Sequence, residues 1–191
     1  MRKTLTKALC ALWVTAVASS SAWAALDVGE KAPDFTTSAA LAGKVYQFSL
    51  AQQLAKGPVV LYFFPAAFSV GCSIEAHEFA EATAKFEALG ATVVGISTDD
   101  IETLAKFSVQ SCQSKFSVAS DAAKTIVKEY DASMMLMPGF ANRVSYVISP
   151  AGVVVYNYQS LNPSKHVEKT LAALREWAQV KAAAAPNAAP R

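Results

Sequence analysis

Two stretches of this sequence are apolar at nearly every position, which is the pattern of strands that are buried on both faces. The first covers residues 58–64, with the sequence PVVLYFF, and the second covers residues 91–97, with the sequence ATVVGIS. Both are short and rich in β-branched or aromatic side chains, which favours strands over helices. We therefore expect both to lie in the centre of a sheet.

Segments with apolar residues at helical spacing follow these strands. Phe79, Thr83 and Phe86 share one face of an expected helix over residues 72–89, and Gly90 is placed to end it. Three further helices are expected, each opened by a side chain that can cap it. The first begins at Asp99 or Asp100 and runs to about Cys112, and the second begins at Asp121 and runs to about Tyr130. The third begins at Asn162 and has an apolar stripe of Val167, Leu171, Leu174 and Ala178.

The remaining strand signals complete an alternating order of strands and helices. Residues 116–119 form a short expected strand, and residues 143–148 and 152–158 form a hairpin around a turn at 149–152. Strand, helix, strand and helix followed by a hairpin and a closing helix predict a mixed central sheet flanked by helices on both faces. The predicted class is α/β, and this order of elements is that of the thioredoxin-like fold.

The first 24 residues are expected to be a cleaved signal peptide. Three basic residues precede a short apolar run, and Ala22-Trp23-Ala24 supplies the small residues of a cleavage site. The apolar run is shorter than the roughly 20 residues that a membrane-spanning helix needs. We therefore expect an exported protein, in a bacterial periplasm.

Removal of residues 1–24 changes both the charge and the cysteine content. The whole chain has a net charge of +2, but the signal holds three of the 17 basic residues and none of the 15 acidic ones, which leaves −1. No basic excess remains to bind nucleic acid or a membrane surface. Cys10 leaves with the signal, so Cys72 and Cys112 remain as an even pair that can form one disulfide.

The rest of the chain is expected to form one domain over residues 25–180, followed by an Ala/Pro-rich, disordered tail over residues 181–191. The sequence is 53% hydrophobic and 17% charged. This composition excludes a disordered polar chain and is sufficient for a packed core.

Cys72 is the candidate nucleophile because it lies where a buried strand gives way to a helix. In the first turn of a helix, free N–H groups and the helix dipole favour the thiolate, which is the reactive form of cysteine. A strand-to-helix loop can also expose the sulfur to a substrate. The alternative reading of Cys72 alone is an inert cysteine in the core.

The loop before Cys72 resembles the active-site loop of the peroxiredoxin family. Pro65, Ser69 and Cys72 match its motif P-x-x-x-[ST]-x-x-C, and Arg143 begins a segment, RVSYVI, that is similar to the family's arginine strand. Gly-Cys-Ser-x-Glu around Cys72 is similar to the peroxiredoxin Q, or bacterioferritin comigratory protein, branch. Two weaker similarities, at residues 29–35 (GEKAPDF) and 119–121 (ASD), extend the resemblance over most of the domain.

The resemblance implies a thiol-dependent peroxidase that reduces hydrogen peroxide or organic hydroperoxides without a metal or organic cofactor. It makes Cys72 the peroxidatic nucleophile, with Pro65 shielding the sulfur and with Ser69 and Arg143 donating hydrogen bonds to the peroxide. Glu75 matches the family's supporting glutamate, although at this position it is also an ordinary first-turn acid. An external dithiol protein, similar to thioredoxin, is the implied reductant.

The resemblance also implies that Cys112 resolves the Cys72 sulfenic acid as an intramolecular disulfide, after local unwinding. Many members of the branch carry the resolving cysteine five residues after the peroxidatic one, where this chain has His77, and others carry it in the following helix. Two alternatives remain open. The pair can be a permanent disulfide of an oxidising compartment, or Cys112 can be inert beside a single-thiol mechanism.

The two histidines do not indicate a metal site, because neither has cysteine or histidine neighbours at ligand spacing. His77 is expected on the surface of its helix. His166, which follows Lys165 in the last helix, is expected to be solvated.

Two other functions compete with a peroxidase. A thiol–disulfide oxidoreductase on the same fold needs C-x-x-C, where this chain has Ser69 and Cys72. A non-catalytic peroxide sensor or interaction protein could use a Cys72–Cys112 switch, but no output domain is visible. Monomer and homodimer are equally compatible with the sequence.

Overall fold

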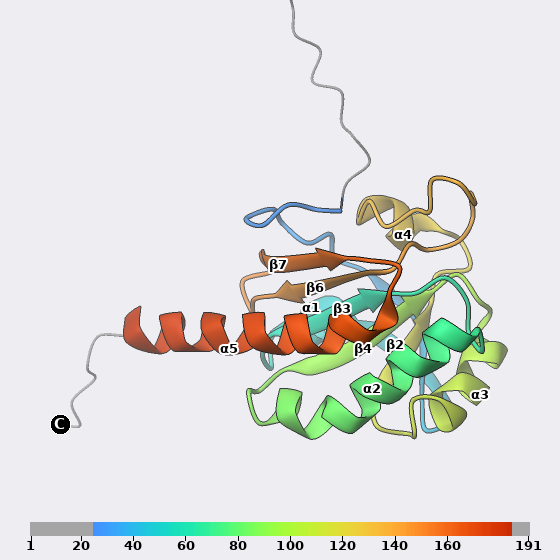
Figure 1. Cartoon of the computed structure of the whole chain (residues 1–191), viewed down its shortest axis with the longest axis horizontal. Coiled ribbons are helices and arrows are strands. Elements are labelled where there is room, and N and C mark those ends of the chain that lie inside the picture. The colour runs from blue at the N-terminus through green and yellow to red at the C-terminus, as the bar shows by residue number, and fades with distance from the viewer. Residues whose placement is uncertain (1–24, 185–191) are drawn as a thin grey trace, which may run out of the picture.

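Seven strands form one mixed sheet in the computed structural model, which describes residues 25–184 (Figure 1). Across the sheet the strands lie in the order β2 (Lys44–Ser49), β1 (Thr36–Leu41), β5 (Ser117–Ser120), β4 (Thr92–Ser97), β3 (Val59–Phe63), β6 (Val144–Ile148) and β7 (Val154–Gln159). β4 pairs parallel with β3 and β5, and the other pairs are antiparallel. The predicted α/β class with a thioredoxin-like mixed sheet is confirmed.

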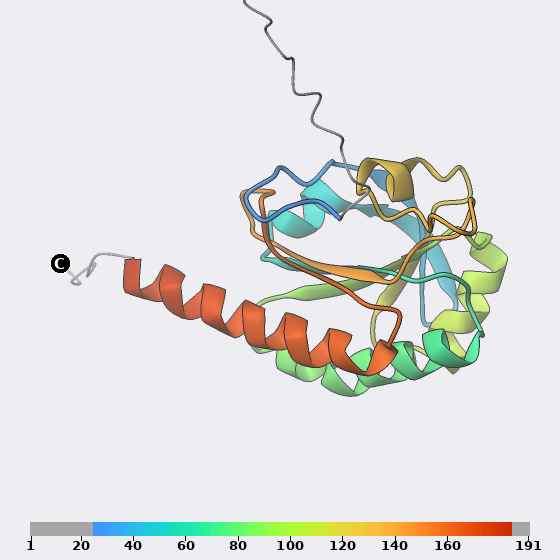
Figure 2. The ribbon, with the colours of Figure 1, turned by 45° about the horizontal axis from the view of Figure 1, so that its top comes forward.

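Helices cover both faces of this sheet (Figure 2). α1 (Leu50–Leu54) and α4 (Thr125–Glu129) pack on one face, and α2 (Val70–Glu87), α3 (Ile101–Gln110) and α5 (His166–Ala184) pack on the other. A short 3-10 helix, η1 (Pro163–Lys165), leads into α5. None of the helices within residues 25–184 is both long and apolar enough to cross a membrane.

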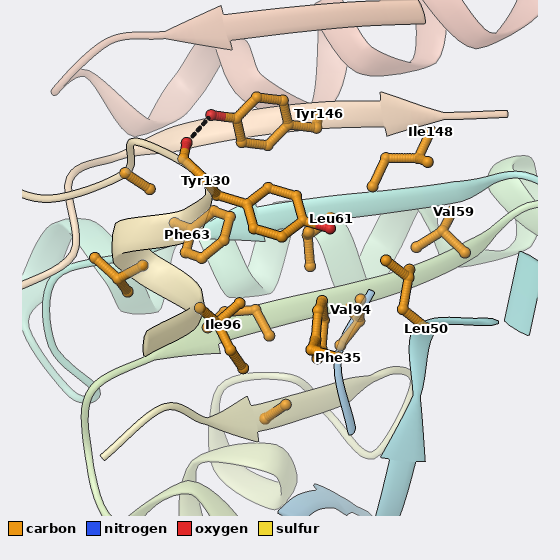
Figure 3. Close-up of a cluster of buried hydrophobic side chains, with 14 of the residues drawn as sticks. Phe35, Leu50, Val59, Leu61, Phe63, Val94, Ile96, Tyr130, Tyr146 and Ile148 are labelled. Carbon is orange, nitrogen blue, oxygen red and sulfur yellow. Dashed lines mark hydrogen bonds between the residues drawn. The ribbon is translucent and has the colours of Figure 1, made fainter. Parts of the chain in front are cut away.

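β3 divides the core into two hydrophobic clusters because its alternate side chains point to opposite faces. Leu61 and Phe63 belong to the cluster on the side of α1 and α4, which Figure 3 shows. Val60 and Tyr62 belong to the cluster on the side of α2, α3 and α5, and this second cluster also contains Cys72. All residues of β3 are buried, as expected of a central strand.

The predicted strands at the centre of the sheet and the hairpin of β6 and β7 are confirmed, with small shifts at their ends. α3 ends at Gln110, so Cys112 lies just after the helix rather than in its last turn. α4 begins at Thr125 rather than at Asp121, because the Asp121 carboxylate caps it from a distance by accepting from the N–H groups of Thr125 at 3.0 Å and Val127 at 2.7 Å. The sequence patterns do not predict β1, β2 or α1.

α5 is longer than predicted. It continues to Ala184, past residue 180, where we place the end of the domain from the sequence. Alanine is the strongest helix former, so the first alanines of the tail extend the helix although they are exposed. The rest of the tail, residues 185–191, and the proposed signal with Cys10, residues 1–24, lie outside the described residues.

Two buried tyrosines allow a matched test of what a buried hydroxyl contributes to stability. Among the described residues the Tyr62 hydroxyl has no hydrogen-bond partner. The Tyr146 hydroxyl donates to the Tyr130 carbonyl at 2.7 Å and accepts from the Leu26 N–H at 3.2 Å (Figure 3). We expect Tyr62→Phe to raise the free energy of unfolding by about 1 kcal/mol and Tyr146→Phe to lower it by about 1–2 kcal/mol. Urea unfolding measures both, and a loss of stability in Tyr62→Phe would contradict this expectation.

Candidate active site

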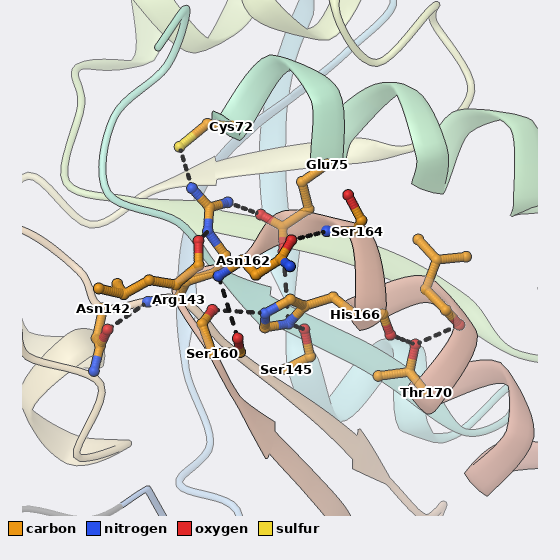
Figure 4. Close-up of polar contacts among 12 residues, drawn as sticks. Cys72, Glu75, Asn142, Arg143, Ser145, Ser160, Asn162, Ser164, His166 and Thr170 are labelled. Atoms are coloured by element: carbon orange, nitrogen blue, oxygen red, sulfur yellow. Dashed lines mark hydrogen bonds and ion pairs between the residues drawn. The ribbon is translucent and has the colours of Figure 1, made fainter. Parts of the chain in front are cut away.

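Cys72 lies in the first turn of α2, as predicted, and is only 2% exposed. Arg143 Nη2 donates a hydrogen bond to its sulfur at 3.3 Å (Figure 4). The N-terminal end of α2 adds the positive end of the helix dipole. Both features favour negative charge on the sulfur, which is the form of cysteine that acts as a nucleophile.

Arg143, which directly precedes β6, is buried and held by three separate contacts. Besides Cys72, its Nη1 donates to Glu75 Oε2 and its Nε donates to the Leu161 carbonyl at 3.2 Å. Gly71 leaves room for the side chain, since a β-carbon at that position would lie 3.2 Å from Arg143 Nη2. Because each guanidinium nitrogen has its own acceptor, the positive charge is fixed against the sulfur.

Glu75 is fully buried three residues after Cys72, a spacing that puts both side chains on the same face of α2. Burial raises the pKa of Glu75 from 4.5 to about 8, and Arg143 opposes this rise. Oε2 accepts from Arg143, whereas Oε1 has no hydrogen-bond partner among the described residues. Glu75 is therefore buried in the network around Arg143, whereas an ordinary acid near a helix start is exposed.

The prediction for His166 is wrong, because its side chain is fully buried instead of solvated. Nδ1 lies 2.8 Å from Ser145 Oγ and 3.6 Å from Glu75 Oε1, and Nε2 lies 2.9 Å from the Ser160 carbonyl (Figure 4). Burial lowers the pKa of His166 from 6.5 to about 4. Burial thus disfavours a charge on this ring, which belongs to the polar network behind Cys72.

A signal for this burial is present in the sequence of α5. His166, Thr170 and Leu174 recur at intervals of four and are all buried, so the inward face of the helix begins one residue earlier than the predicted stripe. His77, in contrast, is exposed as predicted, where it lies 2.7 Å from the side chain of Gln113.

The loop between β3 and α2 carries the other two predicted site residues. Pro65 is half-buried, and Ser69 is exposed. The Ser69 hydroxyl donates to the Ala66 carbonyl at 3.0 Å, and no hydrogen bond between Ser69 and Cys72 is found among residues 25–184. Ser69 therefore lies on the loop before α2, but its hydroxyl is bonded to Ala66 and not to Cys72.

Asp99 has a role that the sequence patterns do not predict. Its Oδ2 accepts from the Ala67 N–H at 2.7 Å and from the Ser97 hydroxyl at 2.6 Å, which fastens the loop before α2 to the end of β4. Asp100 is the residue that caps α3, by accepting from the Thr103 N–H at 2.7 Å. Of the two aspartates considered as helix caps, one therefore holds the loop of the site instead.

Cys112 lies apart from the Arg143 network. It is fully buried just after α3, in the same hydrophobic cluster as Cys72, and both cysteines are free thiols. Burial raises the pKa of the Cys112 thiol far above its ordinary value, so this thiol is neutral in the folded chain. Gln113 and Ser114, which follow it, have φ values of +50° and +60°, a conformation that residues other than glycine seldom adopt.

The chemistry available to the described residues is that of a thiol fixed beside a guanidinium. Between residues 25 and 184, no group of three or more His, Cys, Asp or Glu side chains is placed to hold a metal ion. The site instead offers a nucleophile in Cys72 and a positive charge in Arg143, at 3.3 Å from each other.

Glu75 and His166 make the stability of the fold depend on pH in opposite senses. Glu75 binds its proton more tightly when folded, so its contribution is fully present below about pH 4.5 and is lost as the pH rises towards 8. His166 binds its proton less tightly when folded, so its contribution is present above pH 6.5 and is lost as the pH falls towards 4. Between pH 4.5 and 6.5, the changes in the free energy of unfolding due to Glu75 and to His166 have opposite signs and largely cancel.

We therefore expect the free energy of unfolding to decrease mainly between pH 6.5 and 8, where Glu75 acts alone. The decrease can reach about 1.4 kcal/mol per pH unit, the value for one proton. Urea unfolding at a series of pH values measures it. The Glu75→Gln variant should lose this decrease, and an unchanged slope in that variant would argue against the assignment.

Three comparisons with known proteins bear on this arrangement. The sequence profile of the AhpC/TSA family matches residues 28–157. The chloroplastic peroxiredoxin Q of Populus jackii is 38% identical over 120 residues, which are 62% of this chain and 55% of the relative. The chloroplastic peroxiredoxin Q of Arabidopsis thaliana is 34% identical over 169 residues, which cover 85% of this chain and 76% of the relative. The chain thus spans little more than half the length of the first relative.

A solved structure gives the same likeness in three dimensions. The crystal structure of peroxidoxin BcpB from Mycobacterium tuberculosis has a TM-score of 0.70 to this chain at 30% sequence identity. The matched region covers 78% of this chain and 96% of that one. The family match over residues 28–157 includes both Cys72 and Arg143.

Proposed function

The chain belongs to the AhpC/TSA family, in its peroxiredoxin Q branch, and on that premise we propose that it is a thiol-dependent peroxidase. Its substrates are hydrogen peroxide or organic hydroperoxides, and Cys72 is the peroxidatic nucleophile. One observation carries the proposal, namely that the Cys72 sulfur lies at the start of α2 with Arg143 Nη2 at 3.3 Å. An inert core cysteine needs no fixed positive charge, whereas a cysteine that has to react as a thiolate does.

In the first step the Cys72 thiolate attacks one oxygen of the peroxide. The sulfur–oxygen bond forms as the oxygen–oxygen bond breaks, and the leaving hydroxide or alkoxide takes up a proton. Arg143 stabilises the charge as it passes from the sulfur to the departing oxygen. The Ser69 hydroxyl turns from the Ala66 carbonyl to donate to the peroxide, and Pro65 limits the access of water. The product is a Cys72 sulfenic acid.

In the second step Cys112 resolves this sulfenic acid. Its thiol attacks the Cys72 sulfur, a disulfide forms and water leaves. Because Cys112 is fully buried and neutral, the segment around it has to open first. The left-handed backbone at Gln113 and Ser114 supports this opening, since release of the turn after α3 relieves strain there. An external dithiol protein of the thioredoxin type then restores both thiols by exchange.

We further propose that the mature protein acts outside the cytoplasm, in a bacterial periplasm. The basic start, the short apolar run and the small-residue end of residues 1–24 support export. A periplasm is kept oxidising, so the dithiol reductant has to be delivered there. A monomer or a homodimer can carry out this reaction, because both cysteines come from one chain.

The test follows both thiols of the reduced mature protein after one equivalent of hydrogen peroxide. Free-thiol counts and the intact mass are measured over time. We expect rapid loss of both thiols and a mass lower by two hydrogens, which is the signature of an internal disulfide. Loss of thiol no faster than in free cysteine would rule out the peroxidase. A stable Cys72 sulfenic acid beside an intact Cys112 thiol would leave the peroxidase but remove Cys112 from the mechanism.

The same preparation distinguishes the two competing functions. A rate of insulin reduction above the rate of peroxide turnover would indicate a thiol–disulfide oxidoreductase. A single oxidation of Cys72 with negligible turnover in the presence of a dithiol would indicate a peroxide sensor.

A further inference from the structure

The buried acid of the site has one oxygen paired and the other unpaired. Glu75 Oε2 accepts from Arg143 Nη1, but Oε1 has no hydrogen-bond partner among the described residues. The atom that faces Oε1 is His166 Nδ1, at 3.6 Å (Figure 4). Both side chains are fully buried, so neither can turn to bulk water. A buried carboxylate oxygen without a donor is unfavourable, and a proton on it or next to it removes that penalty.

The contacts of the His166 ring leave Nδ1 able to give or take such a proton. Nε2 lies 2.9 Å from the Ser160 carbonyl, which can only accept, so Nε2 carries a hydrogen. In the neutral ring the lone pair of Nδ1 can accept from the Ser145 hydroxyl, at 2.8 Å, or from a protonated Glu75 Oε1. In the charged ring Nδ1–H donates to that same hydroxyl, because a serine serves in either role. The surroundings of the ring therefore fit both protonation states.

We propose that Glu75 and His166 hold one proton between them in the reduced protein, and that His166 is thereby a positioning residue that directs the charge of Arg143 to Cys72. The inference rests on the proposed peroxidase function and deepens it. With the proton, the pair is neutral overall, and the guanidinium charge acts on the thiolate. Without it, Glu75 places a second negative charge on the guanidinium, which competes with the thiolate and repels it.

The other groups that face the pair do not supply a charge that would replace this proton. From β7 the Tyr158 ring meets the His166 ring edge-on, with centroids 4.8 Å apart. The neutral hydroxyl of Ser145 on β6 contacts the ring at Nδ1, and the hydroxyl of Thr170 on α5 donates to the backbone carbonyl of His166. Lys165 is paired with Glu168 at the surface. The negative charge of Glu78, three residues after Glu75 on α2, raises the pKa of Glu75 and so favours the proton instead of replacing it.

Burial acts on the two groups in the direction that the proposal needs. Burial raises the pKa of Glu75, which disfavours the state in which the pair has no proton and Glu75 is a carboxylate. Burial also lowers the pKa of His166, which disfavours the state with two protons, an imidazolium beside a protonated acid. A single proton is the state that leaves the buried pair without net charge. The geometry of Oε1 and Nδ1 allows that proton to lie on either group.

Two substitutions of His166 separate its role towards Glu75 from its role as a structural anchor. His166→Gln can keep an N–H for the Ser160 carbonyl but places no group where Nδ1 lies. His166→Asn places an amide N–H where Nδ1 lies but loses the contact with the Ser160 carbonyl. Thr170→Val is the matched control, since Thr170 is equally buried one turn further along α5. The readout is the rate of Cys72 alkylation by iodoacetamide as a function of pH, measured by mass on the Cys72 peptide.

We expect His166→Asn to lower the alkylation rate at neutral pH by about tenfold and to move the pH profile upward by about one unit, because its amide N–H stabilises an ionised Glu75 without supplying a proton. His166→Gln leaves Glu75 Oε1 without a donor, so the buried acid keeps the proton itself and the variant should keep most of the wild-type rate, and Thr170→Val should match wild type. A profile in folded His166→Asn that equals wild type overturns the inference. So does an order of rates that follows thermal stability instead of the group placed at Nδ1.

Alkylation needs no peroxide, so the inference and the proposed function can fail separately. If the proposed function fails, the wild-type protein is alkylated as expected but does not react with peroxide. If His166→Asn does not fold, spectra of the wild-type protein test the inference instead. Infrared spectroscopy, with Glu75→Gln as reference, reports whether the carboxyl is protonated, and ¹⁵N spectra report the state of the ring. One proton on the pair at neutral pH is expected. An ionised Glu75 beside a neutral ring, or protons on both groups, overturns the inference.

Discussion

Replacing Cys72 by serine is expected to reduce the reaction with hydrogen peroxide to the uncatalysed background. A serine hydroxyl does not ionise in the neutral range, and its oxygen is not oxidised by a peroxide, so the first step has no nucleophile. The fold should persist, because serine is close to cysteine in size and Arg143 keeps Glu75 and the Leu161 carbonyl as acceptors. Peroxide consumption by the reduced mature protein in a single turnover measures the effect.

Cys112→Ser is the matched control for this experiment. It removes the other thiol of the mature chain but leaves Cys72, Arg143 and the start of α2 in place. We expect it to react with the first equivalent of peroxide at the wild-type rate and then to stop as a sulfenic acid, which dimedone traps. If Cys72→Ser consumed peroxide through Cys112 at the wild-type rate, Cys72 would not be the nucleophile.

The centre of the sheet could be predicted from the sequence, and its edge could not. β3 and β4 are recognisable because strands covered on both faces are apolar at successive positions. β2 is an edge strand with mostly exposed side chains, and β1 consists largely of threonine, serine and alanine, so neither shows a clear alternation. Their pairing is defined by contacts between strands rather than by a local pattern.

The site could be predicted as a set of residues but not as a network. Cys72 is found from its place after a buried strand, and Arg143 and Glu75 are found from a family resemblance. Their contacts span 68 and 71 positions of sequence, so local spacing could not show that one guanidinium bonds both the acid and the sulfur. Its neighbour Lys165 predicts a solvated His166, whereas contacts with Ser145 and Glu75, which the sequence does not show, account for its burial.

The removal of Arg143 is expected to have the second-largest effect on the reaction with peroxide. Arg143→Met takes away the positive charge and the donor 3.3 Å from the sulfur, so we expect the second-order rate constant to fall by about a hundredfold or more. Arg143→Lys keeps a charge but cannot hold three acceptors in one plane, and a loss of about tenfold is expected. Stopped-flow measurement of the first turnover gives both values.

The partner of Arg143 decides how these losses are to be interpreted. Without the guanidinium, Glu75 Oε2 remains buried without a donor, and an unsatisfied buried polar group can cost about 1–3 kcal/mol of stability. Each Arg143 substitution is therefore made in wild type and in Glu75→Gln, whose amide can remain buried without a charge. If the hundredfold loss persists in the stabilised double variant, it reflects the charge on the thiolate and the departing oxygen. A rate restored by Glu75→Gln would show that Arg143 only neutralises the acid.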